Sequence, residues 1–261
     1  MPEQQSVDVL VVGAGLAGLH TATLLAEAGH EVLLVERRPR LTGAIRTTGI
    51  FVRRTLDDFP LPAECLGPPI RRVVLYPPGL RRAVTLDSAR DEYRVGDMAP
   101  LYVAAAESAA EAGVQIALGT RFAGRADGAW VVVGPDGPMH VRARFVVGAD
   151  GARSRVAREL ALDRNHHMLV GAEEVFEVPG SPGIPGGDVP PAFHCVLDPS
   201  LAPGYLAWVV NDGRHAHVGV AGYADRFPHG LRRALQRFGA SAPGLTGVTR
   251  PDEVERRGGS I

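Results

Sequence analysis

The sequence predicts a mixed α/β fold in which a domain of parallel strands and helices is interleaved with a domain of antiparallel strands. Two strand–turn–helix patterns, near the start of the chain and around residue 150, indicate the first domain. Short β-like segments separated by proline and Asp-Gly turns indicate the second. We expect the first domain to comprise residues 1–50 and 97–165, and the second to comprise 51–96 and 166–261.

The first pattern has the arrangement that binds a dinucleotide. The β-branched run 7–12 predicts a strand, and Gly13, Gly15 and Gly18 follow it in GxGxxG spacing, opening a helix over 16–28. Gly13 allows a sharp turn, Gly15 leaves room for a pyrophosphate, and Gly18 allows close packing of helix on strand. The N-terminus of the helix would then direct free N–H groups at the phosphates.

An acidic residue completes this pattern. A second strand over 31–35 ends in Glu36, which lies 18 residues beyond Gly18. A carboxylate at about this distance accepts hydrogen bonds from a ribose and disfavours the 2′-phosphate of NADP. With Glu36 and the three glycines, we count Ala14 and Arg37 among the cofactor-binding candidates.

The second pattern begins with an apolar run over 145–148. Asp150 and Gly151 then turn the chain, and a helix is expected from Ser154 to Leu160. Ligands of open α/β sheets bind at the carboxyl ends of the strands, where Asp150 lies. An ordinary strand-to-helix turn with Ser154 as N-cap explains the residues equally well.

The run GADGARSRV over 148–156 resembles the DG motif of two flavoenzyme groups, the FAD-dependent aromatic hydroxylase-type monooxygenases and the geranylgeranyl reductase-type proteins. The resemblance implies bound FAD beside Asp150 and Gly151, with NAD(P)H as the reductant. In one place the chain departs from the motif. Ala157 occupies the position of the usual arginine, and Arg158 follows it. This departure concerns the expected use of NAD(P)H more than the expected binding of FAD.

Two further stretches resemble the same superfamily. RVGDMAPL from Arg94 is similar to its R-x-x-F-D-x-x-L segment, whose arginine reaches the FAD phosphates, and a helix to about residue 112 and a strand over 114–118 are expected there. Arg94 as a plain surface charge is the alternative. PGYLAWVV from Pro203 is similar to a reductase segment that faces the substrate cavity, which implies Tyr205 and Trp208 as substrate residues. The match carries one extra residue and lacks the Phe-Pro-Lys end, and core packing of both aromatics is the alternative.

The rest of the chain supplies strands and loops. Residues 181–191 are rich in glycine and proline and predict a flexible loop. His215 and His217 share one strand face, and with His194 they could meet a metal, but nothing fixes a further ligand and we expect no metal site. Further strands are expected over 47–54, 71–76, 83–86, 92–95, 121–125, 130–133, 139–142, 169–178, 192–197, 205–211 and 215–223, and a helix over 227–238.

Composition excludes several classes of function. The net charge is −1 over 261 residues, so there is no basic footprint for nucleic acid. All 28 basic residues are arginine, which rules out Schiff-base and P-loop lysines in this chain. Cys65 and Cys195 are too few for a disulfide framework and predict a reducing, cytoplasmic location. No run has the length of a membrane span.

These features favour a FAD-dependent oxidoreductase. We expect FAD to be reduced by NAD(P)H and then to serve either hydroxylation by O₂ or hydride transfer to a prenyl-type alkene, on a small apolar or aromatic substrate. FAD carries that chemistry, so no residue is named as catalytic. Two alternatives stay open: a truncated flavoprotein fragment that binds a nucleotide or a partner without turnover, and an NAD-dependent dehydrogenase. Because the family's GD motif would follow residue 261, a partner chain could complete the FAD domain.

Overall fold

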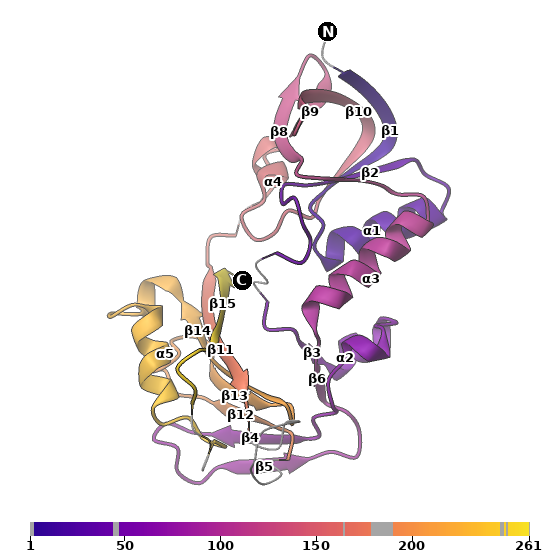
Figure 1. The fold of residues 1–261 in the computed structure, drawn as a ribbon. Helices are drawn as coiled ribbons and strands as arrows, with labels where there is room; N and C mark the ends of the chain where they lie inside the picture. Colours follow the sequence, from indigo (N-terminus) through magenta and orange to yellow (C-terminus); the bar gives the residue numbers. More distant parts are fainter. Residues whose placement is uncertain are drawn as a thin grey trace. The chain divides into compact units, whose positions relative to one another are not determined.

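The computed structural model describes residues 3–43, 47–163, 165–178, 190–245, 248 and 250–260. It consists of two compact units (Figure 1). Unit 1 comprises Met1–Ala44 and Met98–His166, and unit 2 comprises Ile45–Asp97 and His167–Ile261. Most of the loop predicted over 181–191, residues 181–189, lies outside the described residues.

Unit 1 contains a six-stranded sheet in the order β7-β2-β1-β10-β9-β8. β7, β2, β1 and β10 run parallel to one another, whereas β9 and β8 add to β10 in antiparallel fashion. The strands are β1 (Glu3–Val12), β2 (Val32–Glu36), β7 (Gln115–Leu118), β8 (Arg121–Ala126), β9 (Ala129–Gly134) and β10 (Gly137–Gly148).

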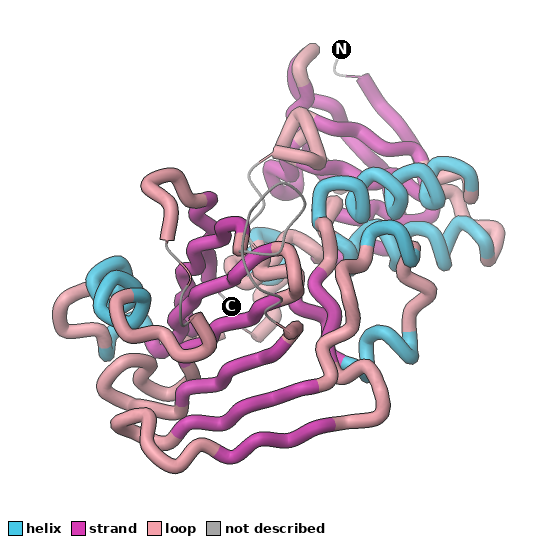
Figure 2. The backbone as a smooth tube through the Cα atoms, turned by 60° about the horizontal axis from the view of Figure 1, so that its bottom comes forward, coloured by secondary structure: helices cyan, strands magenta, loops and turns pink. Residues whose placement is uncertain are grey.

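Two helices cover one face of this sheet, α1 (Leu16–Glu27) and α3 (Met98–Glu111). They lie side by side, as Figure 2 shows. Val9 and Val11 of β1 face these helices, while Leu10 and Val12 pack on the opposite face, where Val156 of α4 (Arg155–Glu159) is buried. β1 is therefore apolar on both sides, as a central parallel strand must be.

β10 is longer than the sequence predicts. The expected strands 139–142 and 145–148 are one continuous strand, because β10 pairs with β9 over Gly137–Val141 and with β1 over Met139–Gly148. Beyond Val141, no strand among the described residues pairs with the second edge of β10, and Phe145 there is 63% exposed. An open strand edge can accept a further strand, and a partner chain at this edge stays a prediction.

Unit 2 contains a seven-stranded sheet in the order β15-β11-β14-β13-β12-β4-β5. All neighbours are antiparallel except β12 and β4. The strands are β4 (Arg72–Tyr76), β5 (Val84–Asp87), β11 (Leu169–Glu177), β12 (Ala192–Val196), β13 (Ala207–Asn211), β14 (His215–Tyr223) and β15 (Glu255–Ser260).

Smaller elements complete unit 2. Helix α5 (Leu231–Gly239) buries Leu235 and Phe238 on one sheet face, beside Val218 and Val220 of β14. A two-stranded sheet, β3 (Ile50–Val52) and β6 (Tyr93–Val95), is accompanied by α2 (Arg53–Asp58). Two short 3-10 turns are η1 (Ala63–Cys65) and η2 (Ala224–Arg226).

Three of the boundaries in unit 2 that differ from those expected have a local cause. The strand predicted over 47–54 ends at Val52, because Arg53 begins α2, in which Arg54 pairs with Asp58 at 2.5 Å. The helix predicted from residue 227 begins at Leu231, after Gly230 with φ +79°. A strand reaching back to residue 205 is not found, because Gly204 with φ +83° turns the chain before β13.

Among the residues that the structure describes, no helix has the length and apolar character needed to cross a membrane.

Candidate functional site

The glycine turn after β1 has the geometry of a phosphate-binding loop. Gly13 has φ +106° and donates its N–H to the carbonyl of Val35 at 2.8 Å. A Cβ at Gly13 would lie 2.4 Å from the Ala149 carbonyl oxygen, and one at Gly18 would lie 1.8 Å from the Gly13 carbonyl oxygen. Both positions therefore need glycine to let the chain segments approach.

Gly15 differs from Gly13 and Gly18 because no protein atom crowds it. A Cβ there would meet no atom within 4 Å, and the residue is the N-cap of α1. The first N–H groups of a helix have no partner within the helix and attract anions. Open space on a glycine at this point is what close approach of a pyrophosphate requires, so the residues present fit an FAD or NAD pyrophosphate.

Glu36 lies beside this turn. Its side chain is buried, with Oε2 accepting from the Ala14 N–H at 2.9 Å and Oε1 accepting from the Arg38 N–H at 2.9 Å and from Arg38 Nε at 3.1 Å. Burial raises the pKa of the Glu36 carboxyl, but these hydrogen bonds outweigh it, and the pKa lies below its ordinary value. Arg37 is exposed. The sequence analysis did not identify Arg38 as a residue of this site. Its position two residues after Glu36 is the feature that could have indicated it.

Asp150 follows β10 next to the glycine turn. A Cβ on Gly13 would lie 3.1 Å from the Asp150 Cα. The Asp150 carboxylate accepts from Ser154 Oγ at 2.5 Å and from the Arg155 N–H at 2.5 Å, while the Ser154 hydroxyl accepts from the Ala157 N–H at 2.9 Å. Gly151 between them has φ +86°. Asp150 and Ser154 therefore form the cap of α4, and a direct contact of Asp150 with FAD stays a prediction.

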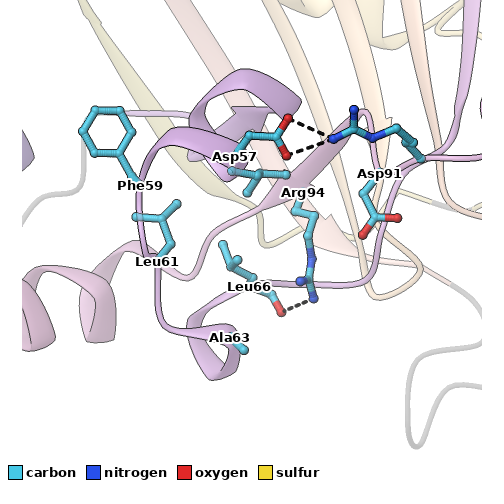
Figure 3. Close-up of a pocket in the computed structure, with 9 residues that line it drawn as sticks. Asp57, Phe59, Leu61, Ala63, Leu66, Asp91 and Arg94 are labelled. Carbon is cyan, nitrogen blue, oxygen red and sulfur yellow. Dashed lines mark hydrogen bonds and ion pairs between the residues drawn. The ribbon is translucent and has the colours of Figure 1, made fainter.

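Arg94 lies in β6 of unit 2, within the strand expected over 92–95, and the helix expected from its motif begins at Met98. Its Nε donates to the Gly67 carbonyl at 2.7 Å and its Nη2 to the Leu66 carbonyl at 3.4 Å. Arg94 lines a cavity of about 410 Å³, shown in Figure 3. The other lining residues are Leu56, Asp57, Phe59, Leu61, Ala63, Leu66, Arg90 and Asp91.

This cavity is apolar on one side and charged on the other. Asp57 pairs with Arg90 at 3.0 Å and Asp91 pairs with Arg71 at 2.9 Å, so both carboxylates are already compensated. Among the described residues, the Nη1 of Arg94 has no acceptor. One donor nitrogen thus remains for an anionic group, and phosphate binding by Arg94 stays a prediction.

The two predicted substrate aromatics have different surroundings. Tyr205 lies in the turn before β13 and is 50% exposed. Trp208 lies in β13, is 5% exposed, and donates its Nε1–H to Glu173 Oε1 at 2.9 Å. Trp208 therefore packs in the core of unit 2 with a satisfied polar atom, whereas Tyr205 is available at the surface.

Glu173 belongs to a buried charged cluster that the sequence reading missed. His217 Nδ1 lies 3.7 Å from Glu173 Oε2, and His217 Nε2 lies 3.6 Å from Asp212 Oδ2. Burial lowers the pKa of His217, but the nearby carboxylates of Asp212 and Glu173 outweigh it and raise the pKa to about 9. The sequence signal was a pair of acidic residues, Glu173 and Glu174, inside the strand predicted over 169–178.

His194 and the two cysteines lie in unit 2. His194 Nδ1 lies 3.0 Å from the hydroxyl of Tyr76. Within the described part of the chain, no group of three His, Cys, Asp or Glu side chains could hold a metal ion. Cys65 and Cys195 are both free and buried, and burial raises the pKa of Cys195 to about 11.

Two family models match the chain. An NAD(P)-binding Rossmann-like domain matches residues 11–66, which include the glycine turn and Glu36. An FAD binding domain matches residues 97–219, which include α3, β10 and the Asp150 turn. The two matched ranges contain the glycine turn and the Asp150 turn, which the structure brings together in unit 1.

Known proteins are similar to between 62% and 99% of this chain. A digeranylgeranylglycerophospholipid reductase of Methanopyrus kandleri is 33% identical over 95% of this chain and 62% of its own. The aklavinone 12-hydroxylase RdmE of Streptomyces purpurascens is 35% identical over 62% of this chain and 36% of its own. The crystal structure of a geranylgeranyl bacteriochlorophyll reductase-like protein from Thermoplasma acidophilum has a TM-score of 0.83 at 22% identity, covering 99% of this chain and 66% of that one. The chain thus spans less than two thirds of these two curated relatives.

Proposed function

Because the chain belongs to the superfamily of FAD-dependent oxidoreductases that includes geranylgeranyl reductases and aromatic hydroxylases, we propose that it serves the NAD(P)H-driven reduction of a prenyl-type alkene. The observation that carries the proposal is the similarity to the Methanopyrus kandleri reductase, which extends over 95% of the chain and hence over both units. The similarity to the hydroxylase covers only 62%.

The residues of unit 1 would hold FAD in a definite way. The open side of Gly15 and the free N–H groups at the start of α1 receive the pyrophosphate. Glu36 is held ionised by Ala14 and Arg38, and its Oε2, which accepts only from the Ala14 N–H, can accept a second hydrogen bond from a ribose hydroxyl. When bound, FAD supplies the transfer of two electrons from NAD(P)H to the substrate.

The residues of unit 2 supply apolar surface and, at Arg94, one donor nitrogen that has no acceptor among the described residues. Tyr205 offers an exposed aromatic ring, and the cavity beside Arg94 carries Leu56, Phe59 and Leu61 on its apolar side. Apolar walls with a single donor suit a chain or ring that ends in, or approaches, an anionic group. We therefore propose an apolar substrate that carries an anionic group, with Arg94 Nη1 as the donor to that group.

Aromatic hydroxylation is the second candidate, since the hydroxylase relative is 35% identical over its matched range. The two reactions differ in their use of O₂. A reductase converts an alkene to an alkane under anaerobic conditions, whereas a hydroxylase consumes O₂ with its substrate. Cytoplasmic location stays a prediction, and the sequence makes no choice between NADH and NADPH.

The test is anaerobic reduction of the FAD-loaded protein by NADH or NADPH, followed by a prenyl alkene. We expect bleaching of the flavin bands, then reoxidation with formation of the saturated product. Gly15→Ala should abolish the signal by filling the pyrophosphate space. Gly239→Ala is the matched control, because a Cβ there also meets no atom within 4 Å but lies at the end of α5. Flavin that binds and does not bleach with either nicotinamide would overturn the proposal.

A further inference from the structure

The register of the unit 2 sheet places five residues in one row across five strands. Arg257 of β15 pairs with Glu173 of β11, Glu173 with Gly219 of β14, Gly219 with Trp208 of β13, and Trp208 with Cys195 of β12. Directly paired residues of an antiparallel sheet share a face. These side chains therefore all point away from α5, whose contacts are made by the alternate residues such as Val218 and Val220.

The indole of Trp208 reaches Glu173 because Gly219 between them has no side chain. A Cβ on Gly219 would lie 2.1 Å from the Cζ2 of Trp208, and one on Gly171 would lie 4.0 Å from its Cη2. The ring thus lies across β14 and donates its N–H to Glu173 Oε1 at 2.9 Å. Glycine at 219 is required for this arrangement, since any side chain would displace the indole.

The second oxygen of Glu173 connects to a buried charge pair. Glu173 Oε2 faces His217 Nδ1, and His217 Nε2 faces Asp212 Oδ2. Asp212 is in turn anchored through Oδ1, which accepts from the N–H groups of Arg214 at 2.8 Å and His215 at 2.6 Å. Glu173 and His217 are each 2% exposed, so solvent cannot replace these contacts.

Three atoms in this series have no hydrogen-bond partner at normal distance: Glu173 Oε2, His217 Nδ1 and His217 Nε2. The two nitrogens face carboxylates on opposite sides of one ring, so they cannot share a single metal ion with Glu173 and Asp212. What the arrangement offers is a site for a proton. An imidazolium between two carboxylates compensates both, whereas a neutral imidazole would leave two buried negative charges close together.

We propose that Asp212, His217 and Glu173 act as one buried charge relay that fixes the Trp208 indole across Gly219, which makes Glu173 and His217 positioning residues for this sheet face. The proton on His217 keeps Glu173 ionised as the acceptor of the indole N–H. Loss of that proton frees Glu173 to move or to take up a proton, and the indole follows. The consequence for substrate binding rests on the proposed function, whereas the coupling of His217 to Trp208 does not.

Other charged groups around His217 belong to three elements. Glu173 faces it from β11, Asp212 from the turn between β13 and β14, and Glu255 of β15 interacts with it electrostatically. On its own strand His215 lies with its ring centroid 6.4 Å away. Arg257 of β15 pairs with Glu255. It also interacts electrostatically with Glu173 and with Asp97. The acidic groups outnumber the cations, which favours the protonated form of His217.

The test is aromatic ¹³C NMR of the full chain as a function of pH. The His217 Cε1–H signal should titrate near pH 9, and the Trp208 ring signals should shift with the same midpoint. The Trp130 signals, from β9 of unit 1, should not share it. Trp208 signals that stay fixed while His217 titrates would overturn the proposal.

Variants separate positioning from mere packing. His217→Gln should remove the Trp208 midpoint, while the neighbour His215→Gln should retain it. Glu173→Gln keeps an acceptor for the indole but removes the charge, so Trp208 should stay in place at neutral pH. The midpoint of the His217 titration should fall by roughly one pH unit or more. If His217→Gln does not fold, the wild-type titration and Glu173→Gln decide alone.

A functional measurement then connects the relay to the substrate. In protein that turns over an alkene, Glu173→Gln should raise KM at pH 9 more than it lowers kcat, by about tenfold against about twofold, because it changes the position of Trp208 rather than the reacting atoms. A roughly tenfold fall in kcat with an unchanged KM would exclude a positioning role. Absence of turnover with an intact NMR coupling would reject the proposed function and leave the relay in place.

Discussion

Substituting two glycines of the same turn should separate folding from cofactor binding. In Gly18→Ala, the new Cβ would lie 1.8 Å from the Gly13 carbonyl oxygen, a backbone atom that cannot rotate away. Overpacking against backbone costs about 3 kcal/mol, at the upper end of its usual range. Because Gly18 lies inside α1, alanine also returns about 1 kcal/mol of helix propensity. The net loss should be about 2 kcal/mol.

Gly15→Ala has the opposite signature. No protein atom lies within 4 Å of the added Cβ, so only the preference of glycine over alanine at an N-cap is lost, about 1 kcal/mol or less. Its FAD affinity should nevertheless fall at least tenfold, roughly, because the methyl group occupies the space of the pyrophosphate.

Thermal melts of the two variants without FAD, together with FAD titrations by flavin fluorescence, provide the assay. Gly18→Ala should melt about 8 °C below the wild type, and Gly15→Ala about 4 °C below it or less. Tight FAD binding by Gly15→Ala, or a Gly18→Ala melt no lower than that of Gly15→Ala, would refute the reasoning from the turn geometry.

Three further predictions concern stability and reactivity. Since the pKa of His217 is raised to about 9, unit 2 should have its full stability below pH 6.5 and lose up to about 3 kcal/mol as the pH rises through 9; a urea midpoint that is flat from pH 7 to 10 would contradict this. Asp150→Ala removes acceptors from the α4 cap and should lower the free energy of unfolding by about 1–2 kcal/mol in urea titrations, with Glu159→Ala at the other end of α4 as the control. Cys65 and Cys195 are buried and their pKa values are raised by burial, so a thiol reagent at pH 7 should label neither in the native protein and both in urea; rapid native labelling of Cys195 would show that β12 opens.

The local features of the sequence predicted the glycine turn and its flanking elements well. The helix after Gly15 ends at Glu27, one residue before the predicted end, and β14 has the predicted bounds His215–Tyr223. Ser154 caps α4 as the helix-start pattern indicated. These elements depend on turn chemistry and short-range periodicity, which a single sequence carries.

Features that depend on strand register could not be predicted in this way. The approach of Glu173 to Trp208 and His217 requires β11, β14 and β13 to pair in one particular alignment, over sequence separations that a local pattern does not contain. The contacts of Arg94 with the carbonyls of Gly67 and Leu66 likewise join residues that lie 27 and 28 positions apart in the sequence. The length of β10 follows from having β1 and β9 as partners, not from its own residues.

The visible absorption spectrum of the purified protein, with and without added FAD, tests the central claim most directly. A site in which Gly13, Gly15, Gly18 and Glu36 hold FAD predicts the paired flavin bands, present on purification or acquired on addition of FAD and retained through gel filtration. Protein that stays colourless after incubation with FAD, while its melt shows a folded chain, would contradict the assignment of this turn as an FAD site.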